Sequence, residues 1–332
     1  MADIVRYGLI STARIGFTAH VPGAATSPNS EIVAVSSRNL ASAEAKAKEH
    51  GIPLAFGSYQ EMIDSDEIDA VINTLPNSMH HEWTIKAAEA GKHVLCEKPL
   101  SATMAQGREM AAAAKANNVI LVEAFTPRWN KQMLTVRKLI ADGEIGDVTM
   151  LEAGLSFTTA NPADIRLNKE LAGGSLMDSG CYAVYAARYA MSAEPISACA
   201  IDRKRSGVDV DTTFNGFLQF PGVGAVAHVW SSVEGPKQRA FKATGTKGII
   251  TIPDAFDETS PVVVTRNQDE EVMQITSTNR FQVQLDEFSE SVLHGRPSEF
   301  PVEDGLRNMA AVLALYKAAD AGNTVDVEQI QS

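Results

Sequence analysis

The chain has 332 residues, of which 45% are apolar and 21% are charged. Its 41 acidic and 29 basic residues give a net charge of -12, without a Lys/Arg-rich run. The length exceeds one ordinary core and predicts two domains in a globular protein. The acidic balance argues against nucleic acid or anionic membrane as a partner. The sequence also lacks a stretch of about 18 apolar residues that could span a membrane.

The start of the chain and its cysteines indicate the compartment. Residues 1–6 lack the basic and then apolar pattern of a secretion signal, which predicts a cytoplasmic protein. The three cysteines, Cys96, Cys181 and Cys199, are odd in number and lack CxxC spacing, so we expect neither a disulfide framework nor a zinc site. Because HExxH spacing is also missing, we predict no metal.

The first segment has the order of a phosphate-binding crossover: an apolar strand over 5–10, a turn and a helix. Of the three glycines in the pattern G-x-G-x-x-G, only Gly16 is kept. Ser and Ala at the first two positions still allow a diphosphate near the helix N-terminus, although they adopt a positive φ less easily than Gly. We expect cofactor contacts from Ser11, Thr12, Ala13, Arg14 and Ile15. The alternative is an ordinary strand-to-helix turn.

The end of the second predicted strand, over 31–36, bears on the choice of cofactor. NAD sites usually place Asp or Glu here to accept from the ribose 2′-hydroxyl, whereas this chain has Ser36-Ser37-Arg38. Hydroxyls and a guanidinium suit a 2′-phosphate, so Ser37 and Arg38 favour NADP, with NAD still possible. Alternatively, Arg38 is an ordinary surface residue before a helix over 41–50 that Asn39 caps.

Further strands are predicted over 70–74, 93–96 and 120–123, separated by helices over 79–90 and 105–117. This alternation predicts a doubly wound parallel sheet. Polar residues follow the strand over 70–74, and we expect this segment beside the cofactor ribose: Thr74, Leu75, Pro76, Asn77 and His80. Helix capping by Asn77 or Ser78 is the alternative explanation, and Thr103 and Gln106 have capping-box spacing at the next helix.

Glu97, Lys98 and Pro99 follow the strand over 93–96 directly. Ligands of open α/β sheets bind outside the carboxyl ends of the strands, so Glu97 and Lys98 are presented to a bound molecule. Pro99 ends the strand and restricts Lys98 to extended geometry. The alternative is a solvated Glu-Lys pair.

The pattern changes in the second half, where a helix over 129–140 is followed by separated strands over 148–157, 196–205, 212–220, 225–233, 238–244, 249–252 and 262–266. Few helices separate these strands, which predicts a mainly antiparallel sheet with one face on helices and the other free to meet a second subunit. Two closing helices, over 281–293 and 304–321, would cover this domain or its junction with the first.

The combined motifs resemble the Gfo/Idh/MocA family of NAD(P)-dependent oxidoreductases over nearly the whole chain. The resemblance is nearest the branch of dihydrodiol, xylose and pyranose dehydrogenases and glucose-fructose oxidoreductase. The residues that carry it are Ser37-Arg38, Pro76-Asn77-x-x-His80, Glu97-Lys98-Pro99 and Gly173-Gly174-Ser175-Leu176-x-Asp178. It implies an N-terminal Rossmann domain over 1–123 and a C-terminal α+β domain over 124–332 for substrate binding and oligomerisation.

The resemblance also implies roles for individual residues. Lys98 reaches the reacting carbon, its bond to Pro99 is cis, and Tyr182 lies in the pocket opposite Lys98. Asp178 and Tyr182 are four residues apart and share a helix face, whereas we expect Tyr185 and Tyr189 to be packing residues. We expect Asp178 and Arg128 to bind substrate. Family members commonly pair through the C-terminal sheet, which implies a homodimer or homotetramer.

The implied chemistry is NADP-dependent hydride transfer to or from a secondary alcohol, hemiacetal or carbonyl of a sugar, polyol or dihydrodiol. A free Tyr has a pKa of about 10, and an ammonium at about 4 Å supplies roughly the 4 kcal/mol needed to bring it near 7. Tyr182 is then the general acid/base, unless Lys98 itself carries the proton. Two other hypotheses are an NAD-dependent glycosidase of the same superfamily and a non-catalytic nucleotide-sensing protein.

Overall fold

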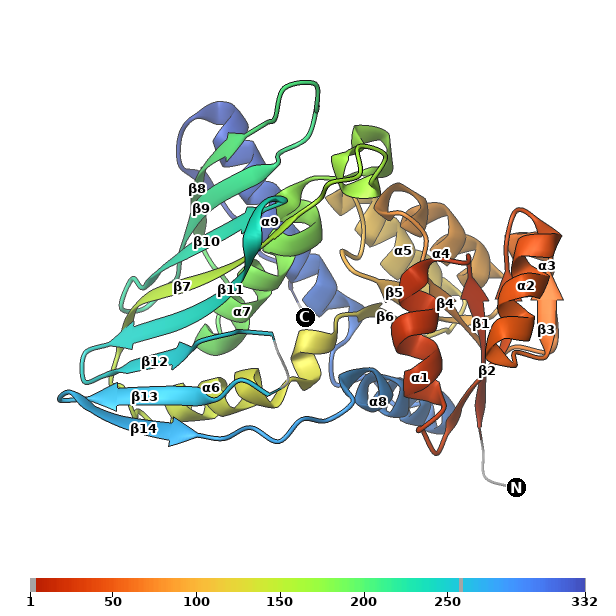
Figure 1. Ribbon diagram of the computed structural model, residues 1–332, viewed down its shortest axis with the longest axis horizontal. Coiled ribbons are helices and arrows are strands. Elements are labelled where there is room, and N and C mark those ends of the chain that lie inside the picture. The colour runs from red at the N-terminus through yellow and green to blue at the C-terminus, as the bar shows by residue number, and fades with distance from the viewer. Residues whose placement is uncertain (1–3, 257–258, 332) are drawn as a thin grey trace. The chain divides into compact units, whose positions relative to one another are not determined.

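A computed structural model describes residues 4–256 and 259–331 (Figure 1). Met1–Asp3, part of the start segment considered above, lie outside this range. The chain forms two compact units, Met1–Thr126 with Asn279–Leu306 and Pro127–Thr278 with Arg307–Ser332. The predicted domain boundary at 123/124 falls close to the first crossing, but a single boundary does not include the return of residues 279–306 to the first unit.

The first unit is built on a six-stranded parallel sheet in the order β3-β2-β1-β4-β5-β6. This is the strand order of a Rossmann fold, which confirms the predicted doubly wound sheet. Apolar residues of its strands are buried on both faces because helices cover the sheet. The strands are β1 (Val5–Ile10), β2 (Ser30–Ser36), β3 (Leu54–Phe56), β4 (Ala70–Asn73), β5 (His93–Glu97) and β6 (Leu121–Ala124).

Short-range signals explain where several helices of this unit begin. Asn39 accepts from the N–H of Ser42 at the start of α2, and Thr103 accepts from the N–H of Gln106 at the start of α5. The N-cap residue of α4 is Met79, whose side chain makes no capping hydrogen bond, and Asn77 and Ser78 lie in the 3₁₀ turn before it. The helices are η1 (Gly16–His20), α1 (Val21–Ala24), α2 (Leu40–His50), α3 (Tyr59–Ile63), η2 (Asn77–Met79), α4 (His80–Glu89), α5 (Met104–Ala116) and α8 (Arg280–His294).

Helix α8 packs in the first unit, whereas we expected it to cover the second domain or its junction with the first. Its Leu285 and Phe288 join the core cluster that contains Tyr7. The hydroxyls of Ser289 and Tyr7 are 2.6 Å apart, and α8 also contacts α1 (Figure 1). Sequence separation hid this placement, since an amphipathic helix does not specify which sheet its apolar face covers.

The second unit holds a nine-stranded sheet in the order β14-β13-β12-β11-β7-β10-β9-β8-β15. Among the strand pairs within the described residues, β7–β10 is parallel and all others are antiparallel, which confirms the predicted mainly antiparallel sheet. We did not predict β14, which is rich in charge, or β15, which has two residues. The strands are β7 (Val148–Thr158), β8 (Ser197–Arg203), β9 (Thr213–Gln219), β10 (Val226–Ser232), β11 (Glu234–Gly245), β12 (Ile249–Ile252), β13 (Val262–Arg266), β14 (Asp269–Met273) and β15 (Val325–Asp326).

One face of this sheet is covered by helices. Helices α7 and α9 lie on this face (Figure 1), and α7 contacts β7 and β10. Leu315 and Tyr316 of α9 lie against Gly216 and Phe214 of β9. The helical segments are η3 (Thr126–Trp129), α6 (Lys131–Ala141), η4 (Ile165–Leu167), η5 (Lys169–Leu171), η6 (Leu176–Gly180), α7 (Cys181–Met191) and α9 (Val302–Ala321), of which η3 and α9 cross between the units. None of the helices within 4–256 and 259–331 combines the length and the hydrophobicity that a membrane-spanning segment needs.

Candidate active site

The turn after β1 lies among the carboxyl ends of neighbouring strands. Ser11 adopts φ 89°, the conformation that a glycine would take most easily. Its Oγ accepts from the N–H of Ala13 at 3.1 Å and lies 2.9 Å from Oγ1 of Thr74, while its own N–H donates to the carbonyl of Ser36. These local hydrogen bonds explain how a serine replaces the first glycine of the fingerprint while keeping the turn tight.

Two arginines beside this turn have the exposure that phosphate recognition requires. Arg14 and Arg38 are both exposed, and neither side chain forms an ion pair or hydrogen bond with a residue that the structure describes. Arg38 follows Ser36, whose carbonyl holds Ser11. The two guanidinium groups are suited to a phosphate-bearing nucleotide, because a guanidinium binds phosphate through paired, charge-assisted hydrogen bonds.

The strand-end segment, defined here as Glu97-Lys98-Pro99-Leu100, is anchored at three points in the first unit. Oε1 of Glu97 is 2.7 Å from Nε2 of buried His20. The carbonyl of Pro99 is 3.0 Å from Nδ1 of His80, and the N–H of Leu100 donates to Oε1 of Glu123 at 2.9 Å.

The Lys98–Pro99 peptide bond is cis, as the resemblance implied. Lys98 itself is partly exposed at the end of β5. The backbone of Lys98 is therefore held by hydrogen bonds of the residues on either side of it.

His80 has a place that differs from the expected contact with the ribose. Its ring is fully buried, and its two nitrogens lie 3.0 and 2.9 Å from the carbonyls of Pro99 and Leu75. Burial lowers the pKa of His80 below its usual value, although both backbone carbonyls act in the opposite direction. His80 therefore ties the loop after β4 to the strand-end segment, and Pro76 and Asn77 remain partly exposed in that loop.

We did not single out His20 or Glu123 from the sequence as site residues. Glu123 is 1% exposed in β6, and an acid that interrupts an apolar strand was the available signal. His20 gave no such signal, since it lies 77 residues before Glu97. The π-helical turn η1 brings its ring to the carboxylate, against the edge of Phe281.

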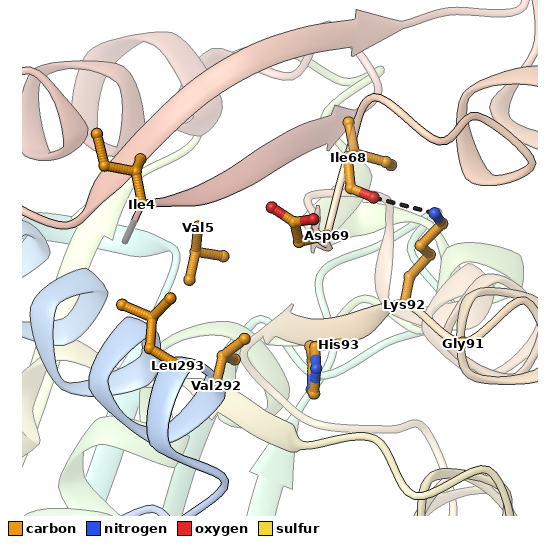
Figure 2. A pocket seen from close by; sticks show the side chains of 9 residues that line it. All are labelled: Ile4, Val5, Ile68, Asp69, Gly91, Lys92, His93, Val292 and Leu293. Atoms are coloured by element: carbon orange, nitrogen blue, oxygen red, sulfur yellow. Dashed lines mark hydrogen bonds between the residues drawn. The ribbon is translucent and has the colours of Figure 1, made fainter. Parts of the chain in front are cut away.

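A cavity of about 410 Å³ lies at the opposite ends of the same strands. Figure 2 shows Asp69, Lys92 and His93 in its wall, with the apolar side chains of Val5 and Val292. Asp69 accepts a hydrogen bond from Arg6. Lys92 donates hydrogen bonds to two backbone carbonyls, one of them that of Ile68 (Figure 2). Since ligands of this fold bind at the carboxyl ends of the strands, this cavity is not the candidate cofactor site.

In the second unit, Asp178 lies in η6 and Tyr182 one turn later in α7. Oδ2 of Asp178 accepts from Nε of Arg166 at 2.7 Å and from Oγ of Ser179 at 3.2 Å. Tyr182 packs edge-on against Phe256, with 5.8 Å between ring centroids. Both Asp178 and Tyr182 are partly exposed, which suits groups that meet a substrate.

The start of this helix is held by a buried carboxylate, Asp211. Its Oδ2 accepts from the hydroxyl of Ser175 and the N–H of Leu176, both at 2.7 Å, and its Oδ1 accepts from the hydroxyl of Tyr316 at 2.7 Å. Asp211 is 2% exposed, and burial raises its pKa against the effect of these hydrogen bonds. A Cβ on Gly174 would lie 2.3 Å from Asp211, so this close contact requires glycine.

Arg128, the other residue expected to bind substrate, is buried in this structure. The side chain is 1% exposed, and its guanidinium carbon lies 5.8 Å from the ring centre of Tyr185. A contact of Arg128 with substrate stays a prediction. Tyr185 and Tyr189 are buried and stacked on each other, in line with their expected packing role.

Lys98 belongs to the first unit and Tyr182 to the second, so their meeting over the nicotinamide stays a prediction. Among residues 4–256 and 259–331, no group of three or more His, Cys, Asp or Glu side chains could hold a metal ion.

Comparisons with known proteins cover both halves of the chain. The family model for the oxidoreductase family with an NAD-binding Rossmann fold, GFO_IDH_MocA, matches residues 5–125, and the model for the GFO/IDH/MocA C-terminal domain matches residues 133–251. D-xylose 1-dehydrogenase (NADP(+)) 2 of Haloferax volcanii is 34% identical over 328 residues, which are 97% of this chain and 99% of that protein.

Two solved structures resemble the chain over nearly its full length. The aldose-aldose oxidoreductase of Caulobacter crescentus, crystallised with glycerol, is 30% identical with a TM-score of 0.90 and covers 97% of this chain and 99% of its own. A 3-ketoreductase of Actinomadura kijaniata in complex with NADP and TDP-benzene is 26% identical with a TM-score of 0.90, over 95% and 98% of the two chains. The chain is therefore an oxidoreductase with a nicotinamide-dinucleotide-binding domain, and it belongs to the GFO/IDH/MocA family.

Proposed function

We propose that this enzyme uses NADP to transfer a hydride to or from a secondary alcohol, hemiacetal or carbonyl of a sugar, a polyol or a dihydrodiol. The observation that carries the proposal is the three-point anchoring of the strand-end segment by His20, His80 and Glu123. Such anchoring places Lys98 at the carboxyl end of β5, where a nicotinamide-binding fold presents its ligands. The names of the xylose dehydrogenase and aldose-aldose oxidoreductase relatives support the substrate class.

The residues of this chain would bind the substrate and move the proton. The cofactor supplies the hydride acceptor or donor, and a proton must leave or reach the substrate oxygen in the same reaction. We assign that proton to Tyr182, with Lys98 stabilising the phenolate and orienting the oxygen. Asp178 accepts a hydrogen bond from a neighbouring hydroxyl. Proton transfer by Lys98 itself is the alternative assignment.

The preference for NADP rests on Ser37, Arg38 and Arg14. No acidic residue follows β2 to accept from a ribose 2′-hydroxyl, and both arginines are exposed beside the turn at Ser11. Replacing Arg38 by Gln should weaken NADP binding about 10- to 150-fold, because one charge-assisted interaction contributes about 1.5–3 kcal/mol. NAD binding should change little, so the NADP/NAD affinity ratio is the discriminating measurement.

The test of the reaction is cofactor reduction or oxidation, followed by absorbance, with D-xylose, D-glucose, polyols and a dihydrodiol. Purified enzyme should show substrate-dependent turnover with NADP and slower turnover with NAD. Cleavage of nitrophenyl glycosides by protein that retains bound NAD(H) would instead support the glycosidase hypothesis. Binding of NADPH with no turnover of any compound would contradict the proposed function.

We also propose that two copies pair through the outer face of the second unit's sheet. Cross-strand register places Ile201, Phe217, Val226 and Met150 on one face, and these side chains are 78%, 46%, 37% and 51% exposed. Apolar side chains on a continuous strand surface are typical of subunit interfaces. Phe217→Glu should therefore shift the mass measured by light scattering toward the monomer. The expected cytoplasmic location is a further proposal, which cell fractionation tests.

A further inference from the structure

Arg166 is a residue of the second unit to which the sequence drew no attention, yet it is fixed at both ends. Its carbonyl accepts from the N–H of Gly174 at 2.8 Å, and a Cβ on Gly173 would lie 2.6 Å from the same oxygen. The Gly173-Gly174 pair therefore lets η4 approach the start of the helix that carries Asp178. This close approach holds the backbone of Arg166 beside the candidate site.

The guanidinium of Arg166 is held as firmly as its backbone. Nε donates to Asp178 at 2.7 Å, Nη1 donates to Asp164 at 3.2 Å, and the group lies over the ring of Phe157 at 5.4 Å. Nη2 forms no hydrogen bond with any residue in the described ranges, and the side chain is 31% exposed. An oriented donor thus stands beside the carboxylate of Asp178.

A donor next to an acceptor matches the hydrogen-bonding capacity of a hydroxyl group, which donates and accepts. A sugar or polyol carries neighbouring hydroxyls, so one can donate to Asp178 while it or the next accepts from Arg166. Preorganisation by Asp164 and Phe157 reduces the conformational entropy lost on binding. The pair therefore suits a polyhydroxylated ligand.

The charge around Arg166 opposes an anionic ligand. Asp164 also lines a surface cavity of about 300 Å³, whose other charged residues are Lys169, Glu170 and Asp209. Arg166 and Asp178 do not line this cavity, but Arg166 contacts its Asp164; counted together, these groups are four carboxylates and two cations, a net charge of -2. In the adjacent segment, Arg203 pairs with Glu234, Lys204 pairs with Asp202, and Arg205 does not line the cavity.

We propose that Arg166 and Asp178 form a clamp for neighbouring hydroxyls and that the acidic wall around them restricts the substrate to an uncharged, unphosphorylated sugar or polyol. The proposal rests on the proposed function and narrows its substrate class. It separates this enzyme from the 3-ketoreductase relative, whose structure holds a TDP compound. Carboxylated, phosphorylated and nucleotide-linked sugars would meet like charge in the second unit.

The first experiment compares neutral and anionic forms of one ring. Binding of D-glucose, D-glucuronate, glucose 6-phosphate and dTDP-glucose is measured by calorimetry with saturating NADP, and turnover is measured in parallel. Glucose should bind at least about 10-fold more tightly than its three anionic counterparts. Equal or tighter binding of an anionic sugar would overturn the inference, and turnover of that sugar would leave the proposed function intact. If no sugar is turned over, the proposed function fails while the binding order still tests the clamp.

The second experiment tests the residue itself, with Arg266 as a matched control. Both arginines pair with two carboxylates, and both side chains are 31% exposed. Arg166→Gln should raise KM for glucose by about 10- to 100-fold, with a smaller change in kcat and an unchanged dissociation constant for NADPH. Arg166→Lys should recover part of the loss, whereas Arg266→Gln should leave KM unchanged. Equal KM values for the three variants and wild type would exclude the clamp.

The third experiment changes the charge of the wall with little change of shape. Asp164→Asn removes one carboxylate that Arg166 contacts and should reduce the discrimination between glucose and glucose 6-phosphate several-fold. Thermal melting of each variant shows whether it is folded, and Asp164→Asn keeps the proposal testable if the Arg166→Gln protein does not fold. An unchanged discrimination ratio in folded Asp164→Asn would contradict the electrostatic part of the proposal.

Discussion

The strand-end segment of the first unit and the helix start at Ser175 in the second unit solve the same problem with different groups. In the first unit, His20, His80 and Glu123 hold the residues on both sides of Lys98. In the second unit, Asp211 collects donors from Ser175, Leu176 and Tyr316 below Asp178. Buried polar side chains, distant in sequence, position the candidate residues in both cases.

The two regions nevertheless respond to pH with opposite signs. Burial lowers the pKa of His80 and raises the pKa of Asp211, because a low-polarity environment disfavours the charged form of either group. The histidine therefore contributes stability above its unfolded pKa of about 6.5 and loses it as pH falls. The contribution of Asp211 is present at low pH and is lost as pH rises through its folded pKa. One physical cause thus makes the units sensitive to opposite pH changes.

The largest expected effect comes from removing the proposed catalytic group of either unit. Tyr182→Phe and Lys98→Met should each lower kcat by roughly 10²–10⁴-fold, the usual contribution of general acid–base catalysis. Steady-state kinetics across pH should show that Tyr182→Phe removes one limb of the profile. Melting temperatures near that of the wild type serve as the control. Near-normal turnover of Tyr182→Phe would show that another group carries the proton.

The next largest effect is a difference in stability between variants of the buried Asp211 and of its exposed neighbour Asp209. Asp211→Ala leaves the donors of Ser175, Leu176 and Tyr316 without this acceptor and should lower the free energy of unfolding by about 3 kcal/mol or more. Asp211→Asn keeps an acceptor oxygen and should cost about 1 kcal/mol. Asp209→Ala, at an exposed position two residues earlier, should change stability by less than about 0.5 kcal/mol. Urea unfolding provides the free energies. An Asp211→Ala protein as stable as Asp209→Ala would show that Asp211 does not anchor the start of the helix.

Glu123 provides the corresponding test in the first unit. Glu123→Ala removes the acceptor of the Leu100 N–H and should cost about 1–3 kcal/mol. Turnover should also fall, because Lys98 would lose its fixed position. Glu123→Gln retains an acceptor oxygen and should preserve most of the activity. Both variants are compared by their free energy of unfolding and by kcat. Equal kcat values for Glu123→Ala and Glu123→Gln would show that this hydrogen bond does not position Lys98.

The smallest effect concerns the pH dependence of stability. Burial also lowers the pKa of His93, whose Nδ1 accepts from the N–H of Ile120, so this ring is held neutral. His93→Asn places an acceptor near the same position without a titrating group. Its loss of unfolding free energy between about pH 7.5 and 5.5 should be smaller than in wild type, by up to about 1 kcal/mol.

Two further variants complete this pH series. Asp211→Asn should reduce the loss of unfolding free energy that occurs as pH rises. His294→Asn, at an exposed position, is the control. Parallel curves for wild type, His93→Asn and Asp211→Asn would refute the assignment of opposite signs to the two units.

Local pattern predicted much of the fold because short-range physics determines strands, turns and caps. The parallel strand order followed from alternating strands and helices, and the Asn39 and Thr103 caps followed from residue type and spacing. Strand β14 was missed because charged residues on an exposed edge strand lack apolar alternation. Ser11 shows the limit of motif matching, since its side chain supports a backbone conformation that the fingerprint assigns to glycine.

The sequence by itself determined the two kinds of sheet and the family. It also predicted that Lys98 follows a strand and that Asp178 and Tyr182 lie in one helical segment, because each of these residues belongs to a short segment with its own local signal. Only the tertiary structure decided that Arg128 is buried, that α8 belongs to the first unit and that Arg166 reaches Asp178. Those outcomes depend on contacts between distant segments, and residue type does not specify which partner a charged or apolar side chain will meet.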